Sequence, residues 1–234
     1  MKIAILSDIH GNSVALQAVL SQVKQLGVQR LFVLGDMVGY YYHPKQVLKM
    51  LSAFDTTMVQ GNHEVMLDEA QKDPAKATMI KGKYGSGISV ALEELSREEV
   101  DMLAHLPQKR TVDIDGVTFL LCHGTPWDYN QYVYPDAPKE MLERCASQGV
   151  DVVLQGHTHY PLEYKGVGGL LLNPGSVGQA RDIGRRASWI LFDTSNRKPE
   201  FVRTPFDILG VMDEARAKDP GVPYLAEVLE RSKV

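Results

Sequence analysis

Residues 2–12 read KIAILSDIHGN, an apolar run that ends in an aspartate and a histidine. The apolar part, Lys2–Ser7, has the length of a buried strand, and Asp8 and His10 come at its end. Open α/β sheets place their functional groups just beyond the C-terminal ends of strands. In extended backbone, two side chains that are two positions apart project to the same side. The stretch therefore predicts a strand that leads directly into a functional site.

Strand and helix patterns alternate through the first third of the chain. Strands are predicted over Lys2–Ser7, Arg30–Leu34 and Thr56–Gln60, and helices over Ser13–Leu26 and Pro44–Ser52. Further along, Ser96 and Glu99 form a capping-box pattern that predicts a short helix ending near Leu106. Alternation of this kind is typical of a largely parallel sheet with covering helices.

The second half of the chain is richer in strand patterns. Strands are predicted over Arg110–Ile114, Val117–Cys122, Val150–Gln155, Gly169–Leu172, Ala187–Phe192 and Glu200–Thr204. Helices are expected over Lys139–Ser147 and, as a pair, after Phe206. The polar stretch Leu67–Lys83 and the aromatic stretch Trp127–Pro138 are interpreted as mobile insertions. Two stacked sheets with helices outside them, in one domain, fit these elements best.

Composition excludes several classes of protein. Of 234 residues, 44% are hydrophobic and 23% charged, with a net charge of -4, which disfavours non-specific nucleic-acid binding because that needs a basic surface. No apolar run approaches the roughly 18 residues that a membrane-spanning helix needs. Cys122 and Cys145 are the only cysteines, too few for a disulfide framework. A cytoplasmic protein is therefore expected.

Five short segments each place His, Asp or Asn just beyond a predicted strand. They are Asp8-Ile9-His10, Gly35-Asp36, Gly61-Asn62-His63-Glu64, Cys122-His123-Gly124 and Gly156-His157-Thr158-His159. Taken singly, each has an ordinary explanation, such as a turn or a helix cap, but their combination favours a metal site. The candidate ligands are Asp8, His10, Asp36, Asn62, His123, His157 and His159. Oxygen and imidazole ligands without thiolate suit Mn, Fe or Zn better than calcium.

Seven ligand side chains are too many for one ion. If one carboxylate bridges, the set suits two divalent ions about 3.5–4 Å apart. Two such ions, two aspartates and one hydroxide leave a formal surplus of one positive charge. The pattern therefore predicts a dinuclear centre for an anionic substrate.

The motif series resembles that of the calcineurin-like metallophosphoesterases. Within them it is similar to the small bacterial and archaeal branch of YfcE-type phosphodiesterases, also through the Asn173–Gly178 segment, NPGSVG. The resemblance runs from Met1 to about Phe192. It implies an α/β fold, a four-layer αββα sandwich of two mixed sheets flanked by helices. Residues 1–234 would form a single domain, with a core over about 1–205 and a C-terminal helical extension over about 206–234.

The resemblance also implies a role for each motif residue. Asp8, His10 and His159 would hold one metal, and Asn62, His123 and His157 the other. Asp36 would bridge the two. A metal-bridging hydroxide would attack phosphorus in line with the leaving oxygen. His63 would be the catalytic residue that is not a ligand, protonating the leaving group or stabilising the phosphoryl oxygens. Manganese is the expected metal, with Fe, Zn, Ni, Co and Mg as alternatives.

Departures from other branches narrow the resemblance. Protein Ser/Thr phosphatases carry Asp-Arg-Gly where this chain has Gly39-Tyr40-Tyr41, so the phosphate-gripping arginine is missing. Purple acid phosphatases place a metal-binding tyrosine where this chain has Gly39, which disfavours a tyrosinate–iron centre. Many relatives follow the catalytic histidine with Asp, whereas Glu64 is one methylene longer here.

The substrate is open at this stage. Arg181, Arg185 or Arg186 are candidates for holding a second phosphate, with a solvated basic loop as the alternative. The aromatic residues between Trp127 and Tyr134 either stack on a nucleobase, fold onto their own domain or make homodimer contacts. Hydrolysis of a phosphodiester, phosphoanhydride or phosphomonoester of a small, nucleotide-like molecule is expected, and diadenosine tetraphosphate is one candidate. A non-catalytic protein-binding scaffold and a nuclease are the alternatives.

Overall fold

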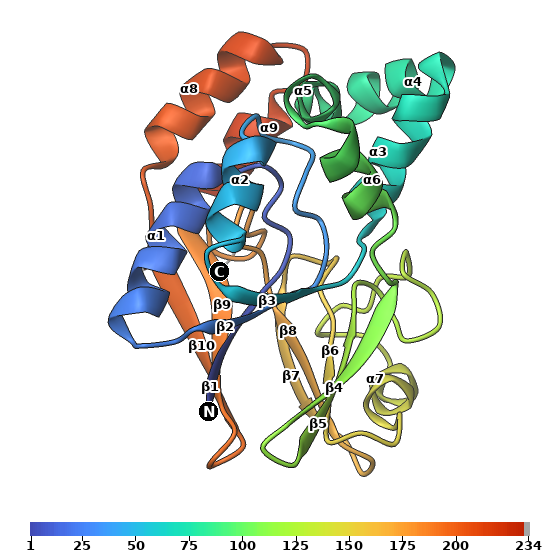
Figure 1. Cartoon of the computed structure of the whole chain (residues 1–234), viewed down its shortest axis with the longest axis vertical. Helices are drawn as coiled ribbons and strands as arrows, with labels where there is room; N and C mark the ends of the chain where they lie inside the picture. The colour runs from blue at the N-terminus through green and yellow to red at the C-terminus, as the bar shows by residue number, and fades with distance from the viewer. Residues whose placement is uncertain (232–234) are drawn as a thin grey trace.

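The computed structural model describes residues 1–231, which form two five-stranded mixed sheets packed face to face (Figure 1). The first sheet has the order β10-β9-β1-β2-β3. Its strands are β1 (Lys2–Leu6), β2 (Arg30–Val33), β3 (Asp55–Met58), β9 (Arg186–Asp193) and β10 (Lys198–Pro205). In this sheet β1, β2 and β3 are parallel, and β9 runs antiparallel to β1. Three functional motifs therefore leave this sheet at one end.

The second sheet has the order β4-β5-β6-β8-β7. Its strands are β4 (Lys109–Ile114), β5 (Val117–Cys122), β6 (Val152–Leu154), β7 (Pro161–Lys165) and β8 (Leu170–Pro174). The central strands β5, β6 and β8 are parallel, and the two edge strands are antiparallel to their neighbours. The Asp115-Gly116 turn, a residue pair common in tight hairpins, joins β4 and β5.

Helices cover the outer faces of both sheets. They are α1 (Ser13–Gln25), α2 (Pro44–Leu51), α3 (Asn62–Lys72), α4 (Pro74–Tyr84), α5 (Gly87–Glu94), α6 (Arg97–Ala104), α7 (Lys139–Ala146), α8 (Ile208–Lys218) and α9 (Tyr224–Glu227), followed by a 3₁₀ turn, Val228–Glu230. The first sheet carries α1 and α2, whereas α7 covers the second. The predicted αββα sandwich is therefore confirmed.

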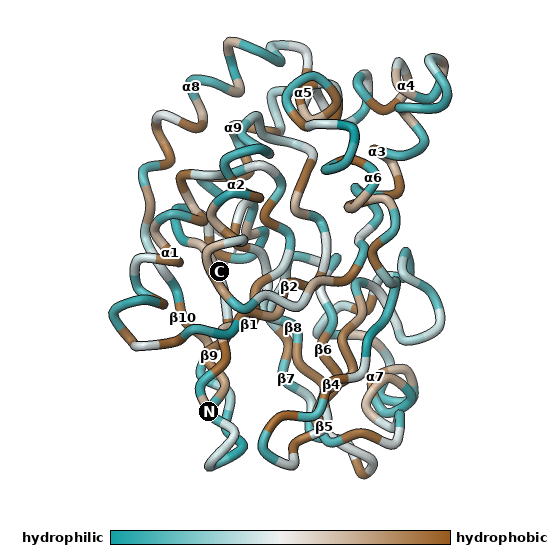
Figure 2. The backbone as a smooth tube through the Cα atoms, viewed as in Figure 1, coloured by the Kyte–Doolittle hydropathy of each residue, from teal (hydrophilic) through white to brown (hydrophobic). Residues whose placement is uncertain are grey.

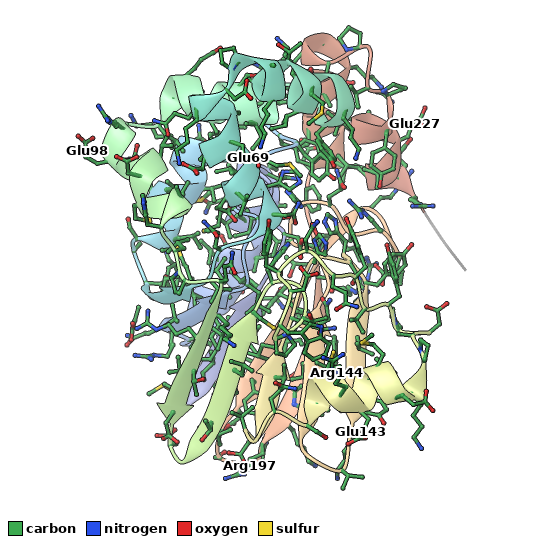
Figure 3. The ribbon with its side chains drawn as sticks, turned by 90° about the vertical axis from the view of Figure 1, so that its right-hand side faces the viewer. Glu69, Glu98, Glu143, Arg144, Arg197 and Glu227 are labelled. Carbon is green, nitrogen blue, oxygen red and sulfur yellow. The ribbon has the colours of Figure 1, made fainter. Side chains whose placement is uncertain are left out.

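Apolar packing between the sheets forms the centre of the molecule. Phe119 packs edge-on against Phe32 and Phe192, with ring centroids 5.5 and 5.1 Å apart. All three side chains are fully buried. Figure 2 shows the corresponding hydrophobic colouring along the strands, whereas the helices alternate between hydrophilic and hydrophobic residues. Cys122 is also buried. Charged side chains such as Glu98 and Arg197 point outward (Figure 3).

The interpretation of Leu67–Lys83 as a mobile insertion is wrong. This stretch forms the end of α3 and most of α4, which join at Asp73. The Asp73 side chain accepts hydrogen bonds from two backbone N–H groups of α4, and Pro74 occupies the first turn. Leu67 and Ile80 are buried. Most of the surface of this stretch faces water, so its apolar residues are few. Their helical spacing is therefore hard to recognise in the sequence. In contrast, Trp127–Pro138 contains neither helix nor strand.

Two further elements, α5 and β7, escape prediction from the sequence. Strand β7 lies at a sheet edge, begins at Pro161 and alternates charged with apolar residues. Edge strands tolerate proline and charge because one side of the strand makes no ladder hydrogen bonds. Within residues 1–231, none of the helices combines the length and apolar character needed to cross a bilayer.

Candidate metal centre

The functional motifs converge at the C-terminal ends of five parallel strands. Asp8 follows β1, Asp36 follows β2, and Asn62 opens α3 after β3. From the second sheet, His123 directly follows β5, and His157 and His159 follow β6. Segments separated by up to about 150 positions thus meet in one buried cluster, as expected for a site at strand ends.

Five of these residues have left-handed backbone conformations. Asp8, His10, Asp36, His157 and His159 have φ values of 55°, 53°, 55°, 68° and 62°. The prediction that extended backbone would align each pair is therefore wrong; the chain turns sharply at each residue instead. Such conformations cost non-glycine residues about 1–3 kcal/mol each and concentrate at functional sites. Their repetition here indicates that ligand placement outweighs local backbone preference.

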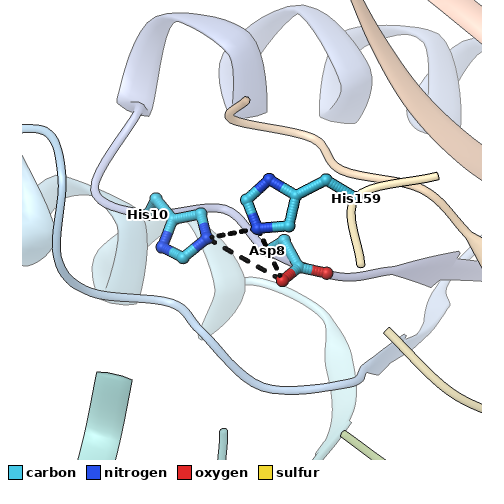
Figure 4. Close-up of side chains that lie close together, drawn as sticks. All are labelled: Asp8, His10 and His159. Atoms are coloured by element: carbon cyan, nitrogen blue, oxygen red, sulfur yellow. Dashed lines mark hydrogen bonds and ion pairs between the residues drawn. The ribbon is translucent and has the colours of Figure 1, made fainter. Parts of the chain in front are cut away.

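The first group of side chains consists of Asp8, His10 and His159 (Figure 4). His10 Nε2 lies 3.1 Å from His159 Nε2. Asp8 Oδ1 lies 3.2 Å from His159 Nε2 and 3.8 Å from His10 Nε2. All three side chains are almost completely buried.

The second group consists of Asn62, His123 and His157. His123 Nε2 lies 2.9 Å from Asn62 Oδ1 and 3.1 Å from His157 Nδ1. Asp36 lies between the groups, because its Oδ2 is 3.3 Å from His123 Nε2 and 3.7 Å from His10 Nε2. Its other oxygen accepts a hydrogen bond from the His63 backbone N–H at 2.8 Å. One carboxylate oxygen therefore faces both groups of histidines.

The outer ring nitrogen of each of four histidines faces a backbone carbonyl. The contacts are His10 Nδ1 to Val38, His123 Nδ1 to Leu34, His157 Nε2 to Asn130 and His159 Nδ1 to Gln179, at 3.3, 2.6, 3.2 and 2.8 Å. Since a carbonyl only accepts, each outer nitrogen carries the hydrogen. In a neutral imidazole the inner nitrogen then presents a lone pair to the cluster. The cluster is therefore a set of converging lone pairs and carboxylate oxygens.

Such a cluster suits divalent cations. Burial lowers the pKa values of His10, His157 and His159, which favours the neutral, metal-binding form. Although burial raises the pKa of Asp8 and Asp36, neighbouring histidines lower both below the ordinary value. Within the described residues, the buried Asp8 Oδ1 has no hydrogen-bond donor. Burial lowers the pKa of His123, but Asp36 outweighs it and raises the value to about 10. A bound cation would displace this His123 proton.

His63 differs from the other histidines of the cluster. Its Nε2 lies 4.0 Å from Asp36 Oδ2, and its buried Nδ1 has no partner among residues 1–231. Its ring packs against those of His10 and Tyr40, with centroids 4.6 and 4.7 Å away. Gly39, at φ 86°, makes room for it, because an added Cβ would collide with His63 Nδ1. Within residues 1–231 no carbonyl fixes the His63 tautomer, which leaves the ring free to exchange a proton. His63 also forms, with His10 and Asp36, a third group of side chains close enough to hold a cation.

Glu64 holds the backbone around Asp36. Its carboxylate accepts hydrogen bonds from the N–H groups of Asp36, Met37 and Gly61 at 2.8, 2.7 and 2.8 Å. The extra methylene relative to Asp thus still allows an orienting contact. The Gly61–Glu64 motif also opens α3, so the same residues begin a helix and lie at the candidate site. Burial, with a further contribution from Asp36, raises the pKa of Glu64 to about 7.

Several contacts around the cluster have no signal in residue spacing. Ser176 Oγ donates to the Asp8 carbonyl at 2.7 Å, and Asn173 Nδ2 donates to the Gly156 carbonyl at 2.7 Å. Tyr132 stacks on His157, with centroids 3.8 Å apart. The NPGSVG segment in the resemblance is the one sequence feature that points to Ser176 and Asn173.

The three arginines proposed from the sequence as substrate contacts lie in different surroundings. Arg186, the first residue of β9, is exposed. Arg181 is near the cluster, with one guanidinium nitrogen 3.2 Å from Tyr40 Oη. Arg185 is exposed and pairs with Glu230 at 3.2 Å. Trp127 lies against Arg144, whose guanidinium is 3.8 Å from the ring centroid. The structure therefore brings Arg181, but not Arg185 or Trp127, to the edge of the candidate centre.

Known proteins are similar to this chain in sequence and fold. The uncharacterized protein MJ0912 of Methanocaldococcus jannaschii is 32% identical over 88% of each chain. A metallophosphoesterase from Sphaerobacter thermophilus superposes with a TM-score of 0.79 at 26% identity, over 98% of each chain. Hypothetical protein PH1004 from Pyrococcus horikoshii reaches 0.86 at 20% identity, over 99% of this chain and 98% of that one.

More distant phosphoesterases share the fold as well. The E. coli phosphoesterase YfcE superposes with a TM-score of 0.52 at 22% identity, over 87% of this chain and 100% of its own. Residues 1–197 match the family model described as the calcineurin-like phosphoesterase superfamily domain. With the ligand motifs converging in space, the chain belongs to the calcineurin-like phosphoesterase superfamily, whose members depend on metal ions.

Proposed function

We propose that this protein is a dinuclear metal-dependent hydrolase of a phosphodiester or phosphoanhydride bond, or of a phosphomonoester, in a small nucleotide-like substrate. One observation carries the proposal. Four buried histidines have their outer nitrogens held by carbonyls, and their inner nitrogens converge on two aspartates. The buried Asp8 Oδ1 has no hydrogen-bond partner within residues 1–231, and a bound cation would supply one.

The distances suggest how the ligands divide between two ions. Asp8, His10 and His159 would hold one ion, and Asn62, His123 and His157 the other. Asp36 would be shared, since its Oδ2 faces His10 and His123. Manganese suits this oxygen and imidazole set, with Fe, Zn, Ni, Co and Mg as alternatives.

When bound, two such ions supply an activated water nucleophile and neutralise charge on the phosphoryl oxygens. The chain supplies the remaining functions. His63 would donate a proton to the leaving oxygen, because its Nδ1 has no partner within residues 1–231. Glu64 would keep the Asp36 carboxylate in place through the backbone.

The buried cysteines and composition favour the cytoplasm as the setting of this reaction.

An activity panel tests this function. Metal-stripped protein would be resupplied separately with Mn, Mg, Zn, Fe, Co or Ni. Each sample would be offered p-nitrophenyl phosphate, bis(p-nitrophenyl) phosphate, cyclic nucleotides and dinucleoside polyphosphates. We expect no turnover by the stripped protein and restored turnover with manganese, because the converging lone pairs need a cation to act. Absence of turnover with every metal and substrate would sink the proposal and favour a binding scaffold.

A further inference from the structure

A pocket of about 580 Å³ lies beside the candidate metal centre. It is formed by the Trp127–Pro138 loop, the segments after His159 and Gln179, and the C-terminal residues. Its principal lining residues are Tyr134, Asp136, Tyr160, Arg181, Tyr224 and Arg231. We call this the Tyr–Arg pocket. Three phenol rings, two guanidinium groups and one carboxylate in one cavity are unusual for a passive surface hollow.

Arg181 links the pocket to the metal centre. Its guanidinium lies 3.2 Å from Tyr40 Oη and 3.3 Å from Gln179 Oε1, both neutral groups. Tyr40 in turn packs against the ring of His10, with centroids 4.5 Å apart. Within residues 1–231, no carboxylate pairs with Arg181, and its buried Nε has no hydrogen-bond partner. A largely buried cation with neutral partners favours binding of an anion.

Aromatic rings form a second link between the centre and the pocket. Tyr132 stacks on His157, and Tyr134 stacks on Tyr132 with centroids 5.8 Å apart and planes only 8° from parallel. Tyr134 also meets Tyr160 edge-on at 5.8 Å. Tyr134 and Tyr224 are each 39% exposed although they line a cavity. Partly exposed rings in a pocket are suited to stack on a planar ligand.

We infer that the Tyr–Arg pocket binds a nucleoside phosphate, the non-reacting end of the substrate whose scissile bond lies at the metal centre. The base would contact Tyr134, Tyr160 and Tyr224. A phosphate would bind Arg181, which lies between the pocket and the centre. Asp136 would accept hydrogen bonds from hydroxyl or amino groups of the ligand. This inference rests on the proposed function and narrows the substrate to esters or anhydrides of a nucleoside phosphate.

Binding to the metal-free protein tests the pocket separately from catalysis. Wild type should bind ADP more tightly than adenosine in isothermal titration calorimetry, because Arg181 contacts phosphate. Tyr134→Ala should weaken ADP binding by roughly tenfold through lost stacking, whereas Tyr134→Phe should retain it. In Arg181→Ala the preference for ADP over adenosine should disappear. Arg97→Ala, which removes an exposed arginine on α6, is the matched control with unchanged ADP affinity. Thermal unfolding would show that each variant is folded.

The outcomes separate the two proposals. ADP binding that follows these variants, without hydrolysis of any ester, would uphold the pocket and defeat the proposed function. Hydrolysis of bis(p-nitrophenyl) phosphate together with ADP affinity that neither Tyr134→Ala nor Arg181→Ala changes would overturn the pocket. Equal affinity of wild type for ADP and adenosine would overturn the phosphate contact of Arg181.

Discussion

Asp36→Asn is expected to abolish hydrolysis and to prevent the protein from binding its full complement of metal. Asp36 Oδ2 faces both groups of histidines, so one substitution removes negative charge from both proposed metal positions. The asparagine keeps the size of the side chain and can still accept from the His63 backbone N–H. Loss of an outer-shell partner costs up to roughly 100-fold in activity, so loss of a shared ligand should cost more.

Metal content by mass spectrometry and turnover of bis(p-nitrophenyl) phosphate would check this expectation on the same samples. Asp101→Asn is the matched control, because Asp101 is an exposed residue of α6. It should leave both quantities unchanged. Turnover by Asp36→Asn at the rate of wild type would show that the bridging assignment is wrong.

His63→Ala should differ from Asp36→Asn in metal content, which it should retain. Its turnover should still fall by roughly 10²–10⁴-fold, the usual scale for loss of an acid–base group. His63 lies farther from Asp36 than His123 does, 4.0 against 3.3 Å, and no carbonyl holds its Nδ1. These features suit a proton donor rather than a ligand. Burial also lowers the pKa of His63, so its protonated form should be lost at a pH below that of an ordinary histidine.

A comparison of good and poor leaving groups tests the acid role of His63 more specifically. A p-nitrophenolate leaving group needs little protonation, so His63→Ala should harm its release less than the release of an alkoxide. His105→Ala is the matched control, since His105 is exposed at the end of α6. If metal content falls together with turnover in His63→Ala, then His63 is a ligand. An equal loss for good and poor leaving groups would exclude its role as an acid.

The sequence predicts the framework of the site because strand ends and ligands are adjacent in the chain. Four of the five motifs come shortly after an apolar strand, so placing the strands also places Asp8, Asp36 and His123. The backbone conformation at these ligands has no such signal. Left-handed turns at Asp8 and His157 arise from tertiary hydrogen bonds, such as that from the His157 N–H to Asp8 Oδ2. Local propensity opposes such turns and cannot predict them.

The surroundings of the centre are still harder to predict from the sequence. Tyr134, Arg181 and Tyr224 come from three distant segments and share a pocket only after folding. No spacing rule connects them. Helix α4 escaped prediction for a related reason, because it has the Asp73 cap and a single buried residue, Ile80, rather than a clear apolar stripe. The sequence therefore predicts the position of side chains that follow a strand, but not the position of side chains that folding brings together from distant segments.

The most direct test of the two-metal assignment is a titration of metal-stripped protein with Mn²⁺, with bound metal and hydrolysis of bis(p-nitrophenyl) phosphate measured in the same samples. The two groups of ligand side chains, with the Asp36 carboxylate between them, predict that turnover rises with bound metal and reaches its plateau at two ions per chain. A plateau at one ion, or two bound ions without turnover, would contradict it.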